Sequence, residues 1–301
     1  MVAYGTSFRP CSAGRINNRE IISKGIRHHT CIIIFMITQE TENLLDWISN
    51  DRVIEILQHR LGDIFERLNE RGEAKGEATL DIILAFALGK TFEEIVEDNK
   101  AVSLTKSLQN NIGYIHQDVL GAVNGWVSTG ASGGDYDIRG ESPLDDIDKS
   151  VYGEVKMRYN TIRGKDRATI WRELERAVRR NGGKKESIGY LIEIVPAKSQ
   201  PYDIVWKFNA TEEVDGKDVK VSFEADYIHR MDGTTAYHVV TGDENAIFNF
   251  LRALPKFLFM AFPKINKNEK ETLEIIENFI ESSMARTLAP KSLYAEKSRE
   301  S

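Results

Sequence analysis

The chain has 301 residues, of which 41% are hydrophobic and 29% charged, and its net charge is −6. This composition is typical of a globular protein and excludes collagenous, disordered and membrane-embedded chains. Cys11 and Cys31 are the two cysteines of the sequence, too few for a disulfide framework. The apolar run at 31–37 is much shorter than the ~20 residues of a membrane span and has no cleavage site. We therefore expect a cytoplasmic protein without a membrane association.

Residues 1–35 differ from the rest of the chain. They hold both cysteines and five Lys/Arg against one acidic residue, without sustained periodicity. The segment that starts at Met36 looks like the beginning of a protein. We predict that 1–35 is a disordered or non-native extension, that 36–287 is a single domain for catalysis and DNA binding, and that 288–301 is a flexible tail. A genuine flexible arm that grips a ligand is the other interpretation of 1–35.

Helical periodicity dominates the chain as far as residue 123. It predicts helices over 44–68, 79–88, 91–99 and 107–123. Glycines between Gly125 and Gly140 then indicate turns and short strands. Further along, the pattern predicts strands at 151–157, 188–195, 202–208, 219–227 and 236–240, and helices at 166–180, 244–262 (interrupted by Pro255) and 269–283. We expect one mixed α/β (α+β) domain, in which an N-terminal helical layer packs on a central mixed sheet flanked by helices.

The charges are unevenly distributed along the chain. Residues 36–100 contain seven Lys/Arg and fifteen Asp/Glu, a net charge of −8, whereas residues 153–185 contain eleven Lys/Arg and four Asp/Glu, a net charge of +7. A basic block within an acidic protein suits a surface that faces phosphates. A solvated helix face is the alternative, and the residues at the start of the block help to decide between them.

A candidate metal site precedes and opens the basic block. In the strand predicted at 151–157, Glu154 and Lys156 are two residues apart, so their side chains leave the same face while Val155 enters the core. Asp137, in a turn before that strand, can converge with them. Two neighbouring carboxylates offer oxygen ligands to a hard divalent cation and leave positions for water and a phosphate oxygen. A lysine beside them can stabilise developing negative charge.

The bare pattern is weak, because an aspartate followed by Glu-x-Lys occurs by chance and can be a surface ion pair. Three features favour a metal-dependent nuclease: the strand is apolar at Val151 and Val155, a glycine-rich turn precedes it, and the basic block follows it. The sequence contains no Walker loop, dinucleotide fingerprint or zinc-ligand spacing.

Several stretches resemble a known family. They are Ile115–Leu120 with Asn124-Gly125-Trp126, Gly133-Gly134 to Asp137-Ile138, Gly153–Thr161, Tyr190–Pro196 and, between Arg230 and Gly242, Arg230-Met231-Asp232-Gly233, Tyr237 and Val240-Thr241-Gly242. Together they are similar to the type II restriction endonucleases of the SinI group, which belong to the PD-(D/E)xK nuclease superfamily. The resemblance extends from about residue 40 to residue 285.

This resemblance implies a restriction-endonuclease-like core that uses Mg²⁺ to cleave double-stranded DNA at a GGNCC or GGWCC palindrome. It also implies a cytosine methyltransferase as a genetic partner. Asp137, Glu154 and Lys156 match the catalytic triplet, with Asp137 and Glu154 as the metal ligands. The turn before Asp137 is longer than in the group, so Asp135 stays open as the ligand. Asp118 stands where the group has Glu, and would be a supporting catalytic carboxylate with a shorter reach.

Other polar residues are candidates for contacts with DNA. Asn160 and Thr161 can bind a phosphate or simply form a turn, and Arg163 and Lys165 are expected to contact phosphates. A predicted strand–turn–strand element has the polar reach to read base edges through Arg230, Asp232 and His238, although an exposed hairpin ion pair would look similar. A palindromic site presents identical half-sites, so we expect a homodimer.

Two other functions remain open. A repair or recombination nuclease of the same superfamily would recognise structure instead of sequence. A non-catalytic DNA-binding protein would carry the triplet without using it. The complete triplet argues against the second of these, and the matching stretch from Arg230 to Gly242, outside the metal site, argues against the first.

Overall fold

The computed structural model describes residues 42–69, 92–130, 134–197, 200–214, 216–265 and 268–288. The chain divides between residues 42 and 43, and every helix and strand described below belongs to the second unit. The predictions for residues 1–35 and for the helix at 79–88 lie outside the described residues, as does the predicted tail 288–301 apart from Leu288, which is buried.

Helices open and close the described chain, and its strands lie between them, interrupted by one α-helix and a short 3-10 turn. In order, they are α2 (Asn50–Asn69), α4 (Phe92–Leu120), β1 (Trp126–Ser128), β2 (Ile138–Glu141), β3 (Ser150–Arg158), α5 (Gly164–Arg180), the 3-10 turn η2 (Gly183–Lys185), β4 (Ser187–Val195), β5 (Asp203–Val205), β6 (Phe208–Val214), β7 (Lys217–Phe223), β8 (Ile228–Asp232), α6 (Gly233–Thr241), α7 (Ala246–Ala261) and α8 (Glu269–Thr287).

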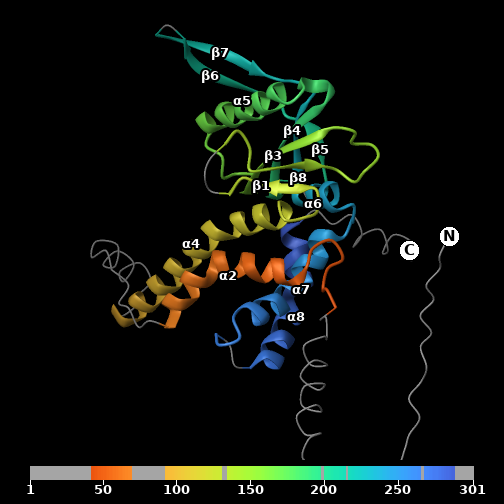
Figure 1. Cartoon of the computed structure of the whole chain (residues 1–301). Helices are drawn as coiled ribbons and strands as arrows, with labels where there is room; N and C mark the ends of the chain where they lie inside the picture. Colours follow the sequence, from red (N-terminus) through yellow and green to blue (C-terminus); the bar gives the residue numbers. More distant parts are fainter. Residues whose placement is uncertain are drawn as a thin grey trace, which may run out of the picture. The chain divides into compact units, whose positions relative to one another are not determined.

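The centre of the fold is a six-stranded mixed sheet with the strand order β1-β2-β3-β4-β8-β5 (Figure 1). β1, β2 and β3 pair antiparallel, β3, β4 and β8 pair parallel, and β5 pairs antiparallel with β8. β6 and β7 form a separate two-stranded hairpin. The predicted fold class, a mixed α/β fold with a central mixed sheet and flanking helices, is confirmed.

Helices cover both faces of the sheet (Figure 1). α5 connects the parallel strands β3 and β4 and packs on one face, whereas α4, α6 and the helices beyond them lie on the other. The strand side chains alternate accordingly. Val155, Ile192 and Met231 are register partners in one core, and the neighbouring residue Leu191 packs in the other core with Leu174 of α5. This alternation places Glu154 and Lys156 on the α5 face.

The helical layer differs from the prediction in its boundaries. α2 begins at Asn50 instead of residue 44, because two side chain–backbone hydrogen bonds hold the segment before it in a non-helical conformation. Leu44 N–H donates to Asn50 Oδ1 (2.9 Å), and Asn50 N–H donates to Asn43 Oδ1 (3.1 Å). The two helices predicted at 91–99 and 107–123 are one helix, α4, since the Ser and Thr residues between them lower helix propensity without breaking the helix.

The strand predicted at 236–240 is wrong, because this segment belongs to α6. Asp232 caps the helix by accepting a hydrogen bond from Thr235 N–H (3.2 Å), and Gly242 ends it with a φ of 78°. Tyr237 and the valines at 239 and 240 are buried, so the helix has little exposed surface and its sequence shows the short apolar run that also suits a strand.

Smaller differences affect the last third of the chain. The strand predicted at 202–208 is split into β5 and the start of β6, and the one at 219–227 ends at Phe223. α7 continues through Pro255. Among the helices described here, none is long and apolar enough to span a membrane.

Candidate active site

Backbone pairing brings Asp137 against the strand that carries Glu154 and Lys156. Asp137 directly precedes β2, whose first residue pairs with Gly153 of β3. Its N–H donates to the Gly153 carbonyl (2.8 Å), and its Oδ2 accepts a hydrogen bond from Val155 N–H (2.8 Å). The aspartate is therefore attached to β3 by both its backbone and its side chain.

Glu154 and Lys156 leave β3 on the same face, as predicted, and Lys156 Nζ donates to Glu154 Oε1 over 2.5 Å. The side chains are 15% and 31% exposed, so the pair is partly shielded from solvent. Burial alone would lower the pKa of Lys156, but the carboxylates of Glu154 and Asp137 outweigh that effect and raise it. The lysine is thus held in its charged form beside the two acids.

The carboxyl group of Asp137 has an unusual affinity for a proton. Burial, followed by the neighbouring negative charge of Glu154, raises its pKa to about 7, although the Val155 N–H favours the ionised form. A divalent cation held here would offset the charge of Glu154 and favour the ionised form of Asp137. Within the described ranges no third Asp, Glu, His or Cys completes a cluster of three. Asp137 and Glu154 thus fit a hard cation that takes its other ligands from water or substrate.

Asp135, the alternative metal ligand, points to a different partner. Its Oδ2 is 2.8 Å from Arg180 Nη1 and its Oδ1 is 3.5 Å from Arg176 Nη1, both on α5. The structure therefore brings Asp137, and not Asp135, to the Glu-x-Lys strand.

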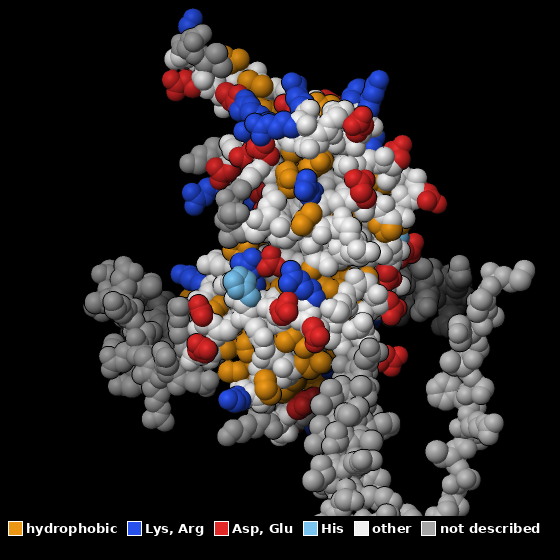
Figure 2. Space-filling view, viewed as in Figure 1, with side chains coloured by type: hydrophobic (Ala, Val, Ile, Leu, Met, Phe, Trp, Pro, Cys, Tyr) orange, Lys and Arg blue, Asp and Glu red, His pale blue; other side chains and the backbone are white. Residues whose placement is uncertain are grey.

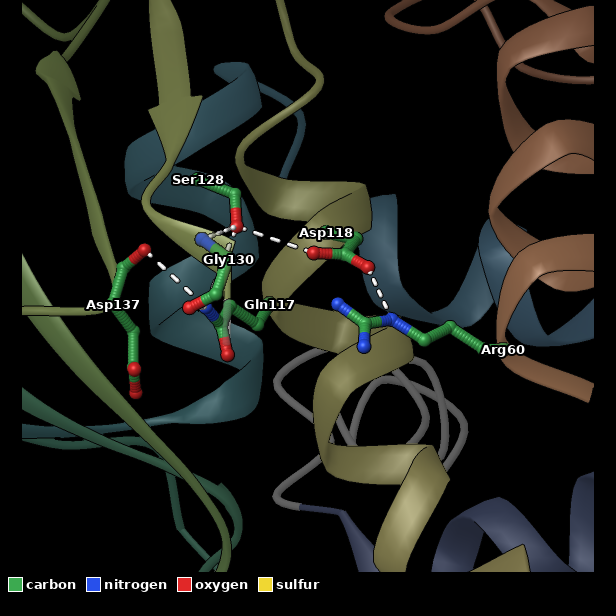
Figure 3. Close-up of polar contacts among 6 residues, drawn as sticks. All are labelled: Arg60, Gln117, Asp118, Ser128, Gly130 and Asp137. Carbon is green, nitrogen blue, oxygen red and sulfur yellow. Dashed lines mark hydrogen bonds and ion pairs between the residues drawn. The ribbon is translucent and has the colours of Figure 1, made fainter. Parts of the chain in front are cut away.

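Asp118 lies apart from these acids. Its Oδ2 is 2.6 Å from Arg60 Nε, and its Oδ1 accepts a hydrogen bond from Ser128 Oγ (3.2 Å). In Figure 3, Ser128 and Gly130 lie between Asp118 and Asp137, whose carboxylate points away. Both oxygens of Asp118 are thus occupied by neighbours, and the structure does not bring this residue into the candidate metal site.

One acidic residue near the site was not predicted from the sequence. Glu173 of α5 lies on the same helix face as Arg176 and Arg180, which bind Asp135. Burial and the charge of Glu154 raise the pKa of Glu173. The helical periodicity of α5 was readable, but which of its faces meets the Asp135 turn depends on tertiary packing.

The residues expected to bind phosphate follow β3 directly. Asn160, Thr161 and Arg163 are exposed. Thr161 Oγ1 also donates to the Arg158 carbonyl (2.7 Å), a hydrogen bond within the turn that follows β3. The Lys165 side chain lies outside the described part of the chain. Figure 2 shows Lys and Arg side chains gathered over α5, which lies within the basic block, with Asp and Glu side chains among them.

The expected strand–turn–strand element around Arg230 is wrong, because β8 leads into α6. Arg230 Nη2 donates to Glu193 Oε2 (2.7 Å), and Glu193 is only 1% exposed. Tyr202 OH donates to the same oxygen (2.5 Å). Asp232 is fully buried and caps α6, so in this conformation it does not present its carboxylate to a base, and His238 lies on α6 with its side chain partly buried.

A mixed sheet between helical layers, with two acids and a lysine converging on paired strands, has the architecture of a restriction-endonuclease-like protein. The chain belongs to the Eco47II restriction endonuclease family, whose model matches residues 45–261. It is 30% identical over 151 residues to the type II restriction enzyme Eco47II of Escherichia coli and 22% identical over 150 residues to the type II restriction enzyme Sau96I of Staphylococcus aureus.

Each of these matches covers 50% of this chain, and 58% and 53% of the respective relative, so the chain matches little more than half the length of either. No solved structure matches the chain.

Proposed function

We propose that this protein is a type II restriction endonuclease that hydrolyses double-stranded DNA at a short palindrome with the help of Mg²⁺. The observation that carries the proposal is the convergence of Asp137 with Glu154 and Lys156, within a chain of the Eco47II family. The resemblance to the SinI group suggests a GGNCC or GGWCC site and the PD-(D/E)xK class. A cytosine methyltransferase encoded alongside would protect the host DNA.

The residues of the site divide the chemistry between them. Asp137 and Glu154 would hold the cation, and a cation held there supplies Lewis-acid stabilisation of charge on the phosphate oxygens. Lys156, kept protonated by its two carboxylate neighbours, donates hydrogen bonds to a phosphate and stabilises the charge that develops in the transition state. Val155 N–H fixes the orientation of the Asp137 carboxylate, so the site is preorganised by backbone pairing.

DNA binding draws on the surface around the site. The scissile phosphate must lie next to β3, the strand that carries Glu154. The residues that follow this strand are therefore proposed to contact the DNA backbone: Asn160, Thr161, Arg163 and Lys165. Arg230 is our candidate for reading a G·C pair, since guanidinium can bind guanine O6 and N7 together. His238, half-buried on α6, is a second candidate for base contacts, and the buried Asp232 is proposed only as the cap of α6.

A palindrome also implies a homodimer, with one metal site for each strand. Analytical ultracentrifugation on the cognate duplex measures this directly. A protein that stays monomeric both free and on DNA would contradict the dimer.

The central test is incubation of the protein with phage DNA and Mg²⁺, with Lys156→Ala and Glu154→Ala as controls. We expect discrete fragments from the wild-type protein, none from either variant, and none after chelation of the metal. Both variants should still bind the cognate duplex in Ca²⁺, because affinity comes mainly from phosphate and base contacts elsewhere. A smear instead of bands would indicate a structure-specific nuclease, and intact DNA a non-catalytic DNA-binding protein. Cleavage by a variant at the wild-type rate would overturn the assigned site.

A further inference from the structure

A largely buried ion pair connects the helical layer to the end of β1. It joins Arg60 of α2 to Asp118 of α4 over 2.6 Å, and the two side chains are 13% and 15% exposed. Such pairs add little net stability, because the cost of desolvating two charges offsets most of their attraction. In some proteins they are retained because they fix geometry. The neighbours of this pair indicate which geometry it fixes here.

The first connection leads from Asp118 to the backbone of Asp137 (Figure 3). Ser128 Oγ donates to Asp118 Oδ1 (3.2 Å) and accepts from Gly130 N–H (3.2 Å) and from Gln117 Nε2 (3.3 Å). The amide of Gln117, a residue only 3% exposed, also reaches the Asp137 carbonyl at 3.5 Å. Ser128 is the register partner of Ile138, which directly follows Asp137.

A second hydroxyl strengthens this connection. Thr129, next to Ser128, donates its N–H to the Asp137 carbonyl (2.8 Å) and its Oγ1 to the Tyr136 carbonyl (2.9 Å). The end of β1 thus fixes the backbone that presents the Asp137 carboxylate to β3, and Asp118 fixes the end of β1.

The other connection leads from Arg60 to the end of β3, the strand that carries Lys156. The guanidinium of Arg60 lies over the ring of Tyr114, 4.8 Å from its centroid, a cation–π contact. Tyr114 follows Gly113, whose Cβ position lies 3.8 Å from the Cβ of Met157, the residue after Lys156 in β3. Arg60 therefore contacts two groups, one in the segment of α4 that packs on the end of β3 and one attached to the strand before Asp137.

We infer that Arg60, through its ion pair with Asp118, is a positioning residue for the nuclease site. The pair holds the end of β1 and the ring of Tyr114, so that Asp137 and Lys156 keep their relative placement when DNA and metal bind. This inference rests on the proposed function, since it assumes that Asp137 and Lys156 are catalytic. It assigns Asp118 to support of the site instead of metal binding.

The test compares Arg60→Lys, Arg60→Met and the double variant Arg60→Met/Asp118→Leu. The double variant removes both charges of the pair, so no buried charge is left without a partner. The positioning role can therefore still be measured if Arg60→Met unfolds. The matched control is Arg52→Met on the same helix, because Arg52 pairs with Glu55 in solvent, with 57% and 65% of the side chains exposed. Loss of an outer-shell partner typically costs 10–100-fold in activity or metal affinity.

We expect the double variant to show a 10–100-fold lower single-turnover rate or a correspondingly higher half-saturating Mg²⁺ concentration. Arg60→Lys should lose less, and Arg52→Met nothing. Hydrogen exchange supplies a readout that is independent of activity: amides in peptides covering 126–141 should exchange faster in the double variant, while those of β4 and β8 should be unchanged.

A folded double variant with wild-type Mg²⁺ dependence and wild-type exchange at 126–141 would overturn the inference. Asp137→Ala is run in parallel to separate this result from failure of the proposed function. If Asp137→Ala is inactive while the Arg60 variants cleave normally, only the positioning role is wrong. If Asp137→Ala cleaves normally, the assigned active site is wrong and the positioning role falls with it.

Discussion

The carboxylate of Asp137 accepts a hydrogen bond from the backbone N–H of Val155 over 2.8 Å, between the two charged residues of the Glu-x-Lys strand. Val155 pairs with Ile192 of the neighbouring strand β4, and its side chain is buried in the core on the opposite face. The sheet therefore fixes the position of its N–H. The aspartate is therefore positioned by a backbone group that no side-chain substitution removes, apart from proline.

This relationship separates the two aspartates of the glycine-rich turn. We expect Asp137→Asn to reduce cleavage by more than about 100-fold, beyond the loss typical of an outer-shell partner. Asp135→Asn should retain cleavage within a few-fold, because Asp135 only pairs with Arg176 and Arg180, whose side chains are 47% and 68% exposed, and such pairs contribute about 0–1 kcal/mol. Single-turnover rates at saturating Mg²⁺ measure both variants, with melting curves as the folding control. The opposite ranking would assign the site to Asp135.

Close backbone packing explains why Gly233 opens α6. A Cβ atom at this position would lie 2.6 Å from the Ile194 carbonyl oxygen of β4, a backbone atom that cannot move aside. We expect Gly233→Ala to lower the free energy of unfolding by about 1–3 kcal/mol, as overpacking does. Gly62, inside α2, has nothing within 4 Å of a Cβ position, so Gly62→Ala should raise stability by about 0.5–1 kcal/mol. Urea unfolding of the two variants checks the contrast, and equal effects would contradict it.

The elements around the site were predictable to different degrees. The strand of Glu154 and Lys156 alternates apolar and charged residues, and α5 has a clear apolar stripe, so both were read from local pattern. α6 was not, because a helix with Tyr237, Val239 and Val240 all buried lacks a polar face to reveal its period.

The polar partners in the site depend on strand pairing, which local patterns do not reveal. Glu193 sits in the apolar strand β4, and its partner Arg230 comes from β8. Asp118 was expected among the catalytic acids, but helix packing places Arg60 of α2 against it. In each case the charged residue was visible in the sequence, whereas its partner followed from the tertiary fold.

A buried histidine makes stability depend on pH. Burial lowers the pKa of His116 to about 4, and its Nδ1 lies 2.8 Å from the hydroxyl of the fully buried Tyr237. Above pH 6.5 the histidine is neutral in both the folded and unfolded states, so its full contribution is present. As the pH falls from about 6.5 to about 4, the unfolded state binds a proton first and stability decreases, by roughly 3 kcal/mol in total.

We therefore expect His116→Gln, which stays neutral and can accept the Tyr237 hydrogen bond, to show a shallower loss of stability between pH 6.5 and 4. Urea unfolding at several pH values measures the slope. His59→Gln, on the exposed surface of α2, is the control and should keep the wild-type slope. If His116→Gln also keeps it, another group is responsible for the acid sensitivity.

Arg230 and Arg163 should differ in what they recognise on DNA. Arg230→Lys keeps a positive charge beside the buried Glu193 but loses the planar guanidinium fork that a bidentate contact with guanine requires. We expect it to weaken binding to the cognate duplex by about 1–3 kcal/mol and binding to a scrambled duplex hardly at all. Arg163→Ala removes an exposed charge shortly after β3. It should weaken binding to both duplexes alike and reduce the slope of log affinity against log salt concentration by about one. Fluorescence anisotropy in Ca²⁺ at several salt concentrations separates the two effects, with melting curves to show that Glu193 is still accommodated. Equal weakening of both duplexes by Arg230→Lys would mean that another residue reads the G·C pair.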